Sequence, residues 1–272
     1  MKRAREILWC CLCGEVQGDA EEVAEPQSPS QNRGGQQNKL GHLAAPVSAV
    51  RSKTSQGSPK VFCSEPSIAL PLVRFMPLTS KLLTPVTWPA FAHLVEKHNG
   101  IFGGCWCISF HLEPGERRHG AAAYKAMKKT LVKQGRAHAA LVFDGPNAVG
   151  WCQFGPTAEL PNIRSKKAYE EGLGELPDWR ITCFFIDRER RGEGIASLAL
   201  REALQEIMRL GGGTVEAYPE DYTGQKVSSS FLCSGTLGMF EKAGFEKSRK
   251  IAMHRWVVNR RLPSKRASRA AS

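Results

Sequence analysis

A charged turn with two glycines stands between a stretch typical of a strand and a stretch typical of a helix. The run 180–187 is β-branched and aromatic, and after Ile195 the apolar residues recur at steps of three and four. Gly192 and Gly194 allow the backbone to come close to a ligand, and free N–H groups at the start of a helix point toward an anion. The stretch therefore predicts a phosphate-binding turn.

The residues of the turn narrow the choice of ligand without fixing it. A Walker A loop would need Gly-Lys-Ser/Thr at the end of the turn, and Ile195-Ala196 excludes it. A dinucleotide-binding fingerprint would need a third glycine where Ser197 stands, although Glu216 lies near the position of that motif's ribose-binding acid. A plain glycine turn into a core helix is the remaining alternative.

Two segments of the chain resemble the GNAT superfamily of N-acetyltransferases. Arg191, Gly194 and Ala196 fill its pattern of Arg or Gln, two residues, Gly, any residue, and Gly or Ala. The segment 237–245 resembles the last helix of that family and its Gly-Phe exit into a strand. The wider segment 88–256 is similar to an uncharacterised subgroup, and the shared residues are Gly104-Cys105-Trp106-Cys107, Val149-Gly150-Trp151 and Glu216-Ala217-Tyr218-Pro219.

The resemblance implies a fold and a cofactor. The fold would be mixed α/β, with a single mostly antiparallel sheet, helices on both faces and splayed central strands. Acetyl-CoA would enter the gap between those strands as the acetyl donor. The backbone of Phe184, Phe185 and Ile186 would pair with the pantetheine arm. The pyrophosphate would be held by the turn and the start of the helix, that is by Arg191, Gly192, Glu193, Gly194, Ile195, Ala196 and Ser197.

Acetyl transfer to an amine needs a base or a water path for the amine proton and an acid for the departing thiolate. Glu216 lies on the strand that flanks the gap, where some members of the family place a glutamate base. An outward-facing strand glutamate is the alternative. The tyrosine that usually protonates the thiolate is replaced by Phe240, so Tyr218, Ser234, Thr236 or water would have to serve.

The elements around these residues can also be predicted. Leu232–Ala243 has the spacing of a helix, and Cys105–His111 has the composition of a strand. Cys105 and Cys107 are interpreted as buried core thiols, with a metal site or a disulfide as the alternatives. Asp187 could cap the turn that follows the strand 180–187.

Composition bounds the class of protein. The net charge of +12 is spread over the chain, because the ratio of basic to acidic residues is 10 to 7 in residues 1–83, 23 to 19 in residues 84–259 and 5 to 0 in residues 260–272. A nucleic-acid interface on the core is not expected from so mild an excess. No apolar run is long enough to span a membrane. The nine cysteines, several of them in apolar stretches, favour reduced thiols inside the cell.

Three segments follow from these patterns. Residues 1–83 are predicted to be a disordered extension, residues 84–259 the N-acetyltransferase domain and residues 260–272 a basic disordered tail. The protein is expected in the cytoplasm, with nuclear import through the tail as an alternative. A lipidated cluster at Cys10, Cys11 and Cys13 is a further alternative for the extension.

The predicted activity is direct attack of a primary amine on acetyl-CoA in a ternary complex, without a covalent enzyme intermediate or a metal. The two alternatives are a non-catalytic acyl-CoA-binding regulator, which Phe240 favours, and a dinucleotide-binding oxidoreductase. The acceptor amine and the oligomeric state are left open by the sequence.

Overall fold

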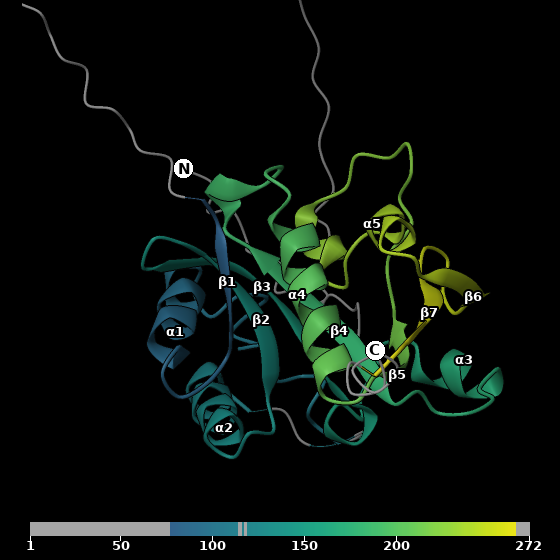
Figure 1. Ribbon diagram of the computed structural model, residues 1–272, viewed down its shortest axis with the longest axis horizontal. Coiled ribbons are helices and arrows are strands. Elements are labelled where there is room, and N and C mark those ends of the chain that lie inside the picture. Colours follow the sequence, from purple (N-terminus) through teal and green to yellow (C-terminus); the bar gives the residue numbers. More distant parts are fainter. Residues whose placement is uncertain (1–76, 114–115, 117–118, 265–272) are drawn as a thin grey trace, which may run out of the picture. The chain divides into compact units, whose positions relative to one another are not determined.

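The computed structural model describes residues 77–264 apart from 114–115 and 117–118. Figure 1 labels the elements along this part of the chain. The strands are β1 (Thr79–Leu82), β2 (His138–Asp144), β3 (Asn147–Pro156), β4 (Trp179–Ile186), β5 (Gly213–Ala217), β6 (Glu246–Lys250) and β7 (Trp256–Leu262). The helices are α1 (Trp88–Lys97), α2 (Ala121–Lys133), α3 (Lys166–Glu171), α4 (Ile195–Arg209) and α5 (Leu237–Lys242), with 3-10 turns at Thr157–Glu159, Arg188–Arg190 and Ser229–Leu232.

All the strands belong to one seven-stranded sheet in the order β1-β2-β3-β4-β5-β7-β6. The pair β4–β5 is parallel, and the other neighbouring pairs are antiparallel. The turn at Gly145 closes the β2–β3 hairpin, and its φ of +56° is one that glycine adopts without strain. The prediction of a mixed α/β fold with a single mostly antiparallel sheet is confirmed.

Helices cover both faces of this sheet because the side chains of its central strands alternate between two cores. Trp151, Cys183 and Phe185 pack with α1 and with Val132 of α2. Cys152 and Phe184 pack on the opposite face with α4, which crosses in front of the strands in Figure 1. The prediction of helices on both faces is also confirmed.

The parallel pair β4–β5 separates partway along β4. Its register runs from Trp179↔Val215 to Ile181↔Ala217, whereas β4 continues to Ile186. Thr182 is an extra residue relative to β3, because Ile181 pairs with Phe154 and Cys183 with Gln153. Such a bulge bends a strand and increases its twist. The expected splay of the central strands is therefore present, and it begins at the bulge.

The structure corrects several boundaries. Thr79–Leu82 form β1, and Arg260–Leu262 belong to β7, so the sheet takes in residues from both segments that were predicted to be disordered. The rest of those predictions, including the cysteine cluster near the N-terminus, concerns residues 1–76 and 265–272 and lies outside the described part of the chain. Within the described residues, none of the helices is long and apolar enough to span a membrane.

Two predicted elements near the site are wrong. Residues 105–111 form turns instead of a strand, and Trp106 and Cys107 have φ of +50° and +55°, which no strand accommodates. The last helix begins at Leu237 and not at Leu232, so Cys233–Thr236 lies outside it. Cys105 and Cys107 are nevertheless buried, as are Cys152 and Cys183 in the strands.

Candidate functional site

The turn after β4 is shaped by two glycines and one aspartate. The carboxylate of Asp187 accepts a hydrogen bond from the Glu189 amide at 3.2 Å, as expected for a cap. Gly192 and Gly194 have φ of +87° and +77°, a region that other residues enter with strain. A Cβ added at either glycine would meet no atom within 4 Å, so the turn borders open space at both positions.

The backbone N–H groups of residues 191–197 donate no hydrogen bond to the described part of the protein. The first amide of α4 to do so is that of Leu198, which bonds to the carbonyl oxygen of Gly194 at 3.0 Å. Helix starts leave such donors without partners, and the helix dipole adds a partial positive charge there. The turn can therefore accept an anion without first breaking a hydrogen bond of its own.

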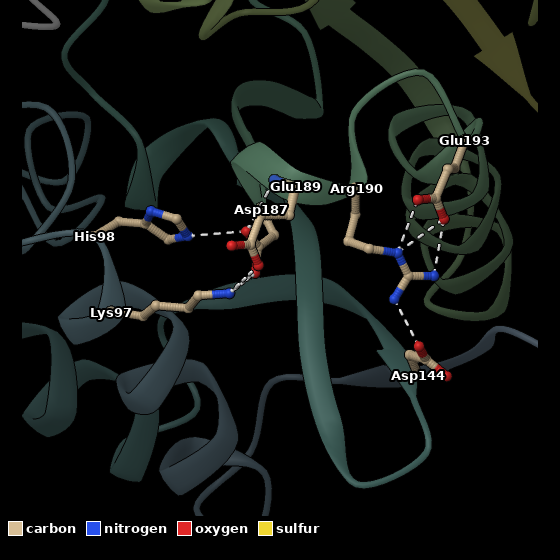
Figure 2. Close-up of polar contacts among 7 residues, drawn as sticks. All are labelled: Lys97, His98, Asp144, Asp187, Glu189, Arg190 and Glu193. Carbon is tan, nitrogen blue, oxygen red and sulfur yellow. Dashed lines mark hydrogen bonds and ion pairs between the residues drawn. The ribbon is translucent and has the colours of Figure 1, made fainter.

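Charged side chains hold both ends of the turn, as Figure 2 shows. Lys97 Nζ and His98 Nε2 lie 2.8 and 3.3 Å from the two carboxylate oxygens of Asp187. Arg190 Nη1 lies 2.6 Å from Asp144 Oδ2, and its Nε donates to both carboxylate oxygens of Glu193 at 2.8 and 2.9 Å. These contacts fix the turn to α1 and to the β2–β3 hairpin.

The same contacts decide which charges remain for a ligand. Arg190 is paired internally, and its hydrogen bonds hold the pKa of the Glu193 carboxyl below its usual value. Arg188 and Arg191 are exposed and form no ion pair with the described residues. The negative charge of Glu193 is therefore balanced by Arg190. Arg188 and Arg191, which form no ion pair with the described residues, lie beside the unpaired amides.

Burial and nearby charges shift the pKa of Asp187 in the turn and that of His98, which follows α1 and contacts Asp187. Burial lowers the pKa of His98, with further lowering from Arg188 and Lys97, although Asp187 opposes it. Burial alone would raise the pKa of Asp187, but hydrogen bonds from Lys97 and the Glu189 amide hold it below 3.8. At neutral pH the turn is thus anchored by an ionised carboxylate.

The backbone of β4 faces two ways beyond the bulge. The Phe184 N–H points away from β3, because it donates to the Cys233 carbonyl at 2.7 Å. The Asp187 N–H points toward β3, because it donates to Val149 at 2.9 Å. By the alternation of a strand, Ile186 faces the same side as Phe184, and Phe185 faces β3. Of the three residues predicted to pair with pantetheine, Ile186 alone presents an amide that is turned to the gap and not engaged by Cys233.

The segment Cys233–Thr236 lies between the diverging strands. Its Cys233 carbonyl holds Phe184 of β4, and its Gly235 carbonyl accepts from the amide of Glu220, just beyond β5, at 3.0 Å. The Glu220 carbonyl in turn accepts from the amide of Leu237 at 3.0 Å. The segment fills the gap beside Phe184. It does not fill the part of the gap that is nearer to Ile186 and the glycine turn.

The predicted catalytic residues lie on the face of β5 opposite α4. Tyr218 and Tyr169 both donate to Oε2 of Glu216, at 3.2 and 2.8 Å. Glu216 is opposite Arg180 in the intact part of the parallel pair, whereas Tyr218 is the first residue after that pair ends. Burial raises the pKa of the Tyr218 hydroxyl well above 10.0, so it carries its proton at neutral pH. The structure thus brings Glu216 and Tyr218 together.

The other predicted acids are placed less favourably. Ser234 is buried and Thr236 is the exposed residue that precedes α5. Phe240 is fully buried, its ring 5.9 Å from that of Phe184 and 5.0 Å from that of Phe245. Phe240 therefore packs in the core beside the gap, as is typical of an apolar side chain.

Two buried polar clusters were missed by sequence reasoning. Lys128 Nζ donates to Gln153 Oε1 at 2.6 Å and lies 3.0 Å from His111 Nε2, and burial lowers the pKa of this lysine. Arg164 and Arg255 converge on Glu220. No local pattern reveals either cluster, because the members are far apart in the chain and each residue type alone is typical of a surface.

Known proteins match this chain in structure and not in sequence. No family model and no curated protein matches the chain. Among solved structures, an N-acetyltransferase from Staphylococcus aureus is 14% identical over 70% of this chain and 100% of that one, with a TM-score of 0.40. A Thermoplasma acidophilum N-acetyltransferase in complex with coenzyme A is 10% identical over 69% and 100%, with a TM-score of 0.38. A Salmonella typhimurium acetyltransferase with acetyl-CoA is 12% identical over 69% and 94%, with a TM-score of 0.39.

The chain has a GNAT-like fold by its own topology: one sheet, one parallel pair at its centre, and a splay that opens beside a glycine turn. The matched structures share less than 25% identity with it, at TM-scores below 0.5. The function proposed for this chain therefore depends on the geometry of its own turn and strands.

Proposed function

We propose that this protein is an acetyl-CoA-dependent N-acetyltransferase that acts on a primary amine in a ternary complex. The observation that carries the proposal is the run of unpaired amides in residues 191–197, directly beside the end of β4 where β5 has separated. A diphosphate with a long arm that can lie along a strand suits this pair of features.

The residues present fit that ligand. The amides of residues 191–197 would hold the pyrophosphate, with Arg188 and Arg191 adding charge. The backbone of Ile186 would pair with the pantetheine arm. Phe184 would contribute its side chain, which lies beside Phe240, and its amide after release from Cys233. Phe185 would contribute through its position in the strand only, because its backbone faces β3.

The reaction needs one carbon–nitrogen bond formed and one carbon–sulfur bond broken. The amine attacks the thioester carbonyl carbon, loses a proton and releases a thiolate, which gains a proton. Tyr218 is the proposed donor to the thiolate, since its hydroxyl is protonated and lies where the strands part. Glu216 is the proposed acceptor of the amine proton, and it would return that proton to Tyr218, whose hydroxyl it contacts at 3.2 Å.

One alternative is favoured by a specific observation. The Cys233 carbonyl occupies the Phe184 amide, and Phe240 stands where a catalytic tyrosine was expected. Both would suit a protein that binds acyl-CoA without turning it over. The two functions differ in their products, because a regulator would bind acetyl-CoA and release no thiol with any amine.

The test is calorimetric titration with acetyl-CoA, CoA and NAD, followed by free-thiol release with a panel of amines. We expect acetyl-CoA and CoA to bind, NAD not to bind, and at least one amine to release CoA. Binding without thiol release on any amine would select the regulator. Binding of NAD without CoA would select the dinucleotide-binding oxidoreductase and end the acetyltransferase proposal.

A further inference from the structure

Two buried arginines lie beside Glu220 and the segment Cys233–Thr236. Arg164 is in the connection between β3 and α3, and Arg255 is in the turn between β6 and β7. Their exposed fractions are 5% and 8%, and that of Glu220, which lies between them, is 4%. Arginine is rarely buried without a partner. Taking its charge out of water costs on the order of several kcal/mol unless hydrogen bonds compensate.

The compensation within the protein is incomplete. Arg255 donates through Nη2 to Glu220 and through Nη1 to Ser165 Oγ at 2.8 Å. Its Nε is buried and has no hydrogen-bond partner among the described residues. A guanidinium carries five N–H donors, so the pairing leaves donor capacity unused.

The contacts of Arg164 within the cluster are long. Its Nη1 lies 3.7 Å from Glu220 Oε1, which is beyond hydrogen-bond distance. The same nitrogen donates to Cys233 Sγ at 3.6 Å, and sulfur is a weak acceptor. Within the described residues, Glu220 is the only carboxylate in an ion pair with either arginine. Two positive charges therefore share one negative charge in a buried setting.

This charge lies next to the proposed reaction centre. Cys233 contacts Arg164 through its sulfur and Phe184 of β4 through its carbonyl, so one residue separates the guanidinium from the strand along which the donor would lie. Ile163, which precedes Arg164, packs in the same apolar cluster as Tyr218. The arginines thus share the face of the sheet on which the proposed acid is found.

We propose that Arg164 and Arg255 bind a carboxylate of the acceptor, so that the acceptor is a small molecule carrying both an amine and a carboxylate. This inference rests on the proposed acetyltransferase function. The ligand is a monoanion because the cluster has one positive charge in excess. It is a carboxylate because the planar fork of a guanidinium matches one, and Glu220 already occupies the cluster with that group.

The test compares amino acids with their amides as acceptors, in pairs such as glycine with glycinamide and L-alanine with L-alaninamide. Amidation removes the carboxylate and leaves the amine in place. We expect kcat/KM for the acid to exceed that for its amide by at least about tenfold, which corresponds to about 1.4 kcal/mol. Equal or better use of the amides would overturn the inference.

Substitutions locate the effect. Arg164→Gln and Arg255→Gln are each expected to lower kcat/KM for the acid about tenfold or more through KM and to leave the amide unchanged. Arg249→Gln is the matched control, since Arg249 is held by the Tyr169 carbonyl at 2.9 Å and lies outside the cluster. Equal losses for acid and amide in the Arg164 variant would contradict a role in recognition. Arg164→Lys keeps the charge and serves if the glutamine variant does not fold.

Glu220→Gln gives an effect of opposite sign. Removing the Glu220 carboxylate leaves both arginines to the ligand. The amino acid should therefore bind more tightly to this variant than to the unsubstituted protein. A purely structural ion pair predicts lower stability and no gain in affinity. Calorimetry with the acids on the CoA-loaded protein reads this without turnover. Acid binding without thiol release would refute the acetyltransferase function alone, whereas thiol release that ignores the carboxylate would refute this inference alone.

Discussion

The carbonyl oxygen of Cys233 accepts a hydrogen bond of 2.7 Å from the backbone N–H of Phe184, across the gap between β4 and the continuation of β5. A strand that has lost its neighbour would otherwise leave this buried amide without a partner, which costs about 1–3 kcal/mol. The segment Cys233–Thr236 thus supports the splay. A ligand that pairs with β4 like an added strand therefore cannot use the Phe184 amide unless this segment moves.

Gly235→Ala should destabilise the protein by about 1–3 kcal/mol. Gly235 has φ of +82°, and a Cβ there would come within 2.8 Å of Met239 Cε and 2.9 Å of Phe240 Cε2. Gly238→Ala is the control, because its Cβ would meet nothing within 4 Å inside α5 and should add about 0.5–1 kcal/mol. Urea unfolding measures both, and equal stability of the two variants would show that the segment is not packed as described.

Gly194→Asp should lower affinity for acetyl-CoA at least about tenfold while the domain stays folded. The new side chain has room, but it places a negative charge beside the unpaired amides and strains a residue with φ of +77°. Gly194→Asn is the matched control, since asparagine tolerates this backbone region and carries no charge. Calorimetry gives the affinity and circular dichroism the fold. Retained affinity in the aspartate variant would move the phosphate site elsewhere.

Tyr218→Phe should lower kcat about 10²-fold or more and leave the Kd for acetyl-CoA unchanged, as loss of a general acid does. Tyr169→Phe removes the other hydroxyl that donates to the same oxygen of Glu216, at 2.8 Å. Because Tyr169 belongs to α3 and meets Glu216 where β5 is still paired with β4, its variant should retain most of the rate. Single-turnover thiol release measures both. If the two variants lose equal activity, the tyrosines act by positioning Glu216.

Stability should fall as the pH is lowered through 6.5 because burial lowers the pKa of His111 and that of His98. The part that belongs to the turn is that of His98. Its folded-state pKa lies below the ordinary 6.5, so the unfolded chain binds the proton first on acidification. Its contribution is therefore complete above pH 6.5 and is lost toward the folded pKa, with a slope of at most about 1.4 kcal/mol per pH unit. His98→Asn should flatten this part of the profile in urea unfolding at several pH values. An unchanged slope would assign the loss to another group.

Asp187 acts in a separate window. Its pKa is held below 3.8, so its contribution is present above that value and is lost only as the pH falls through the lower folded pKa. The His98 effect can thus be measured before Asp187 becomes protonated.

The sequence predicted the features that local rules govern. The glycine turn, α4 and the hairpin at Gly145 follow from periodicity and from backbone conformations that glycine favours. The separation of β4 from β5 was expected only through resemblance to a family, because a bulge at Thr182 leaves no mark in composition. The turns at 105–107 were mistaken for a strand because buried aromatic and cysteine residues are common to both.

The site could be predicted only in part for the same reason. The unpaired amides belong to one continuous segment and were found. The engagement of Phe184 by Cys233 joins residues that are 49 positions apart, and the meeting of Arg164 with Arg255 joins residues that are 91 positions apart. Such contacts are set by packing of the whole domain, and no spacing rule reports them.

The most direct test of the central claim is hydrogen exchange of the backbone amides with and without CoA. Unpaired, exposed amides exchange rapidly, and a bound diphosphate slows them. We predict that CoA slows exchange in residues 191–197 and at Ile186, and that NAD at the same concentration does not. Binding of CoA that leaves residues 191–197 unprotected, with protection at another part of the chain, would contradict the account.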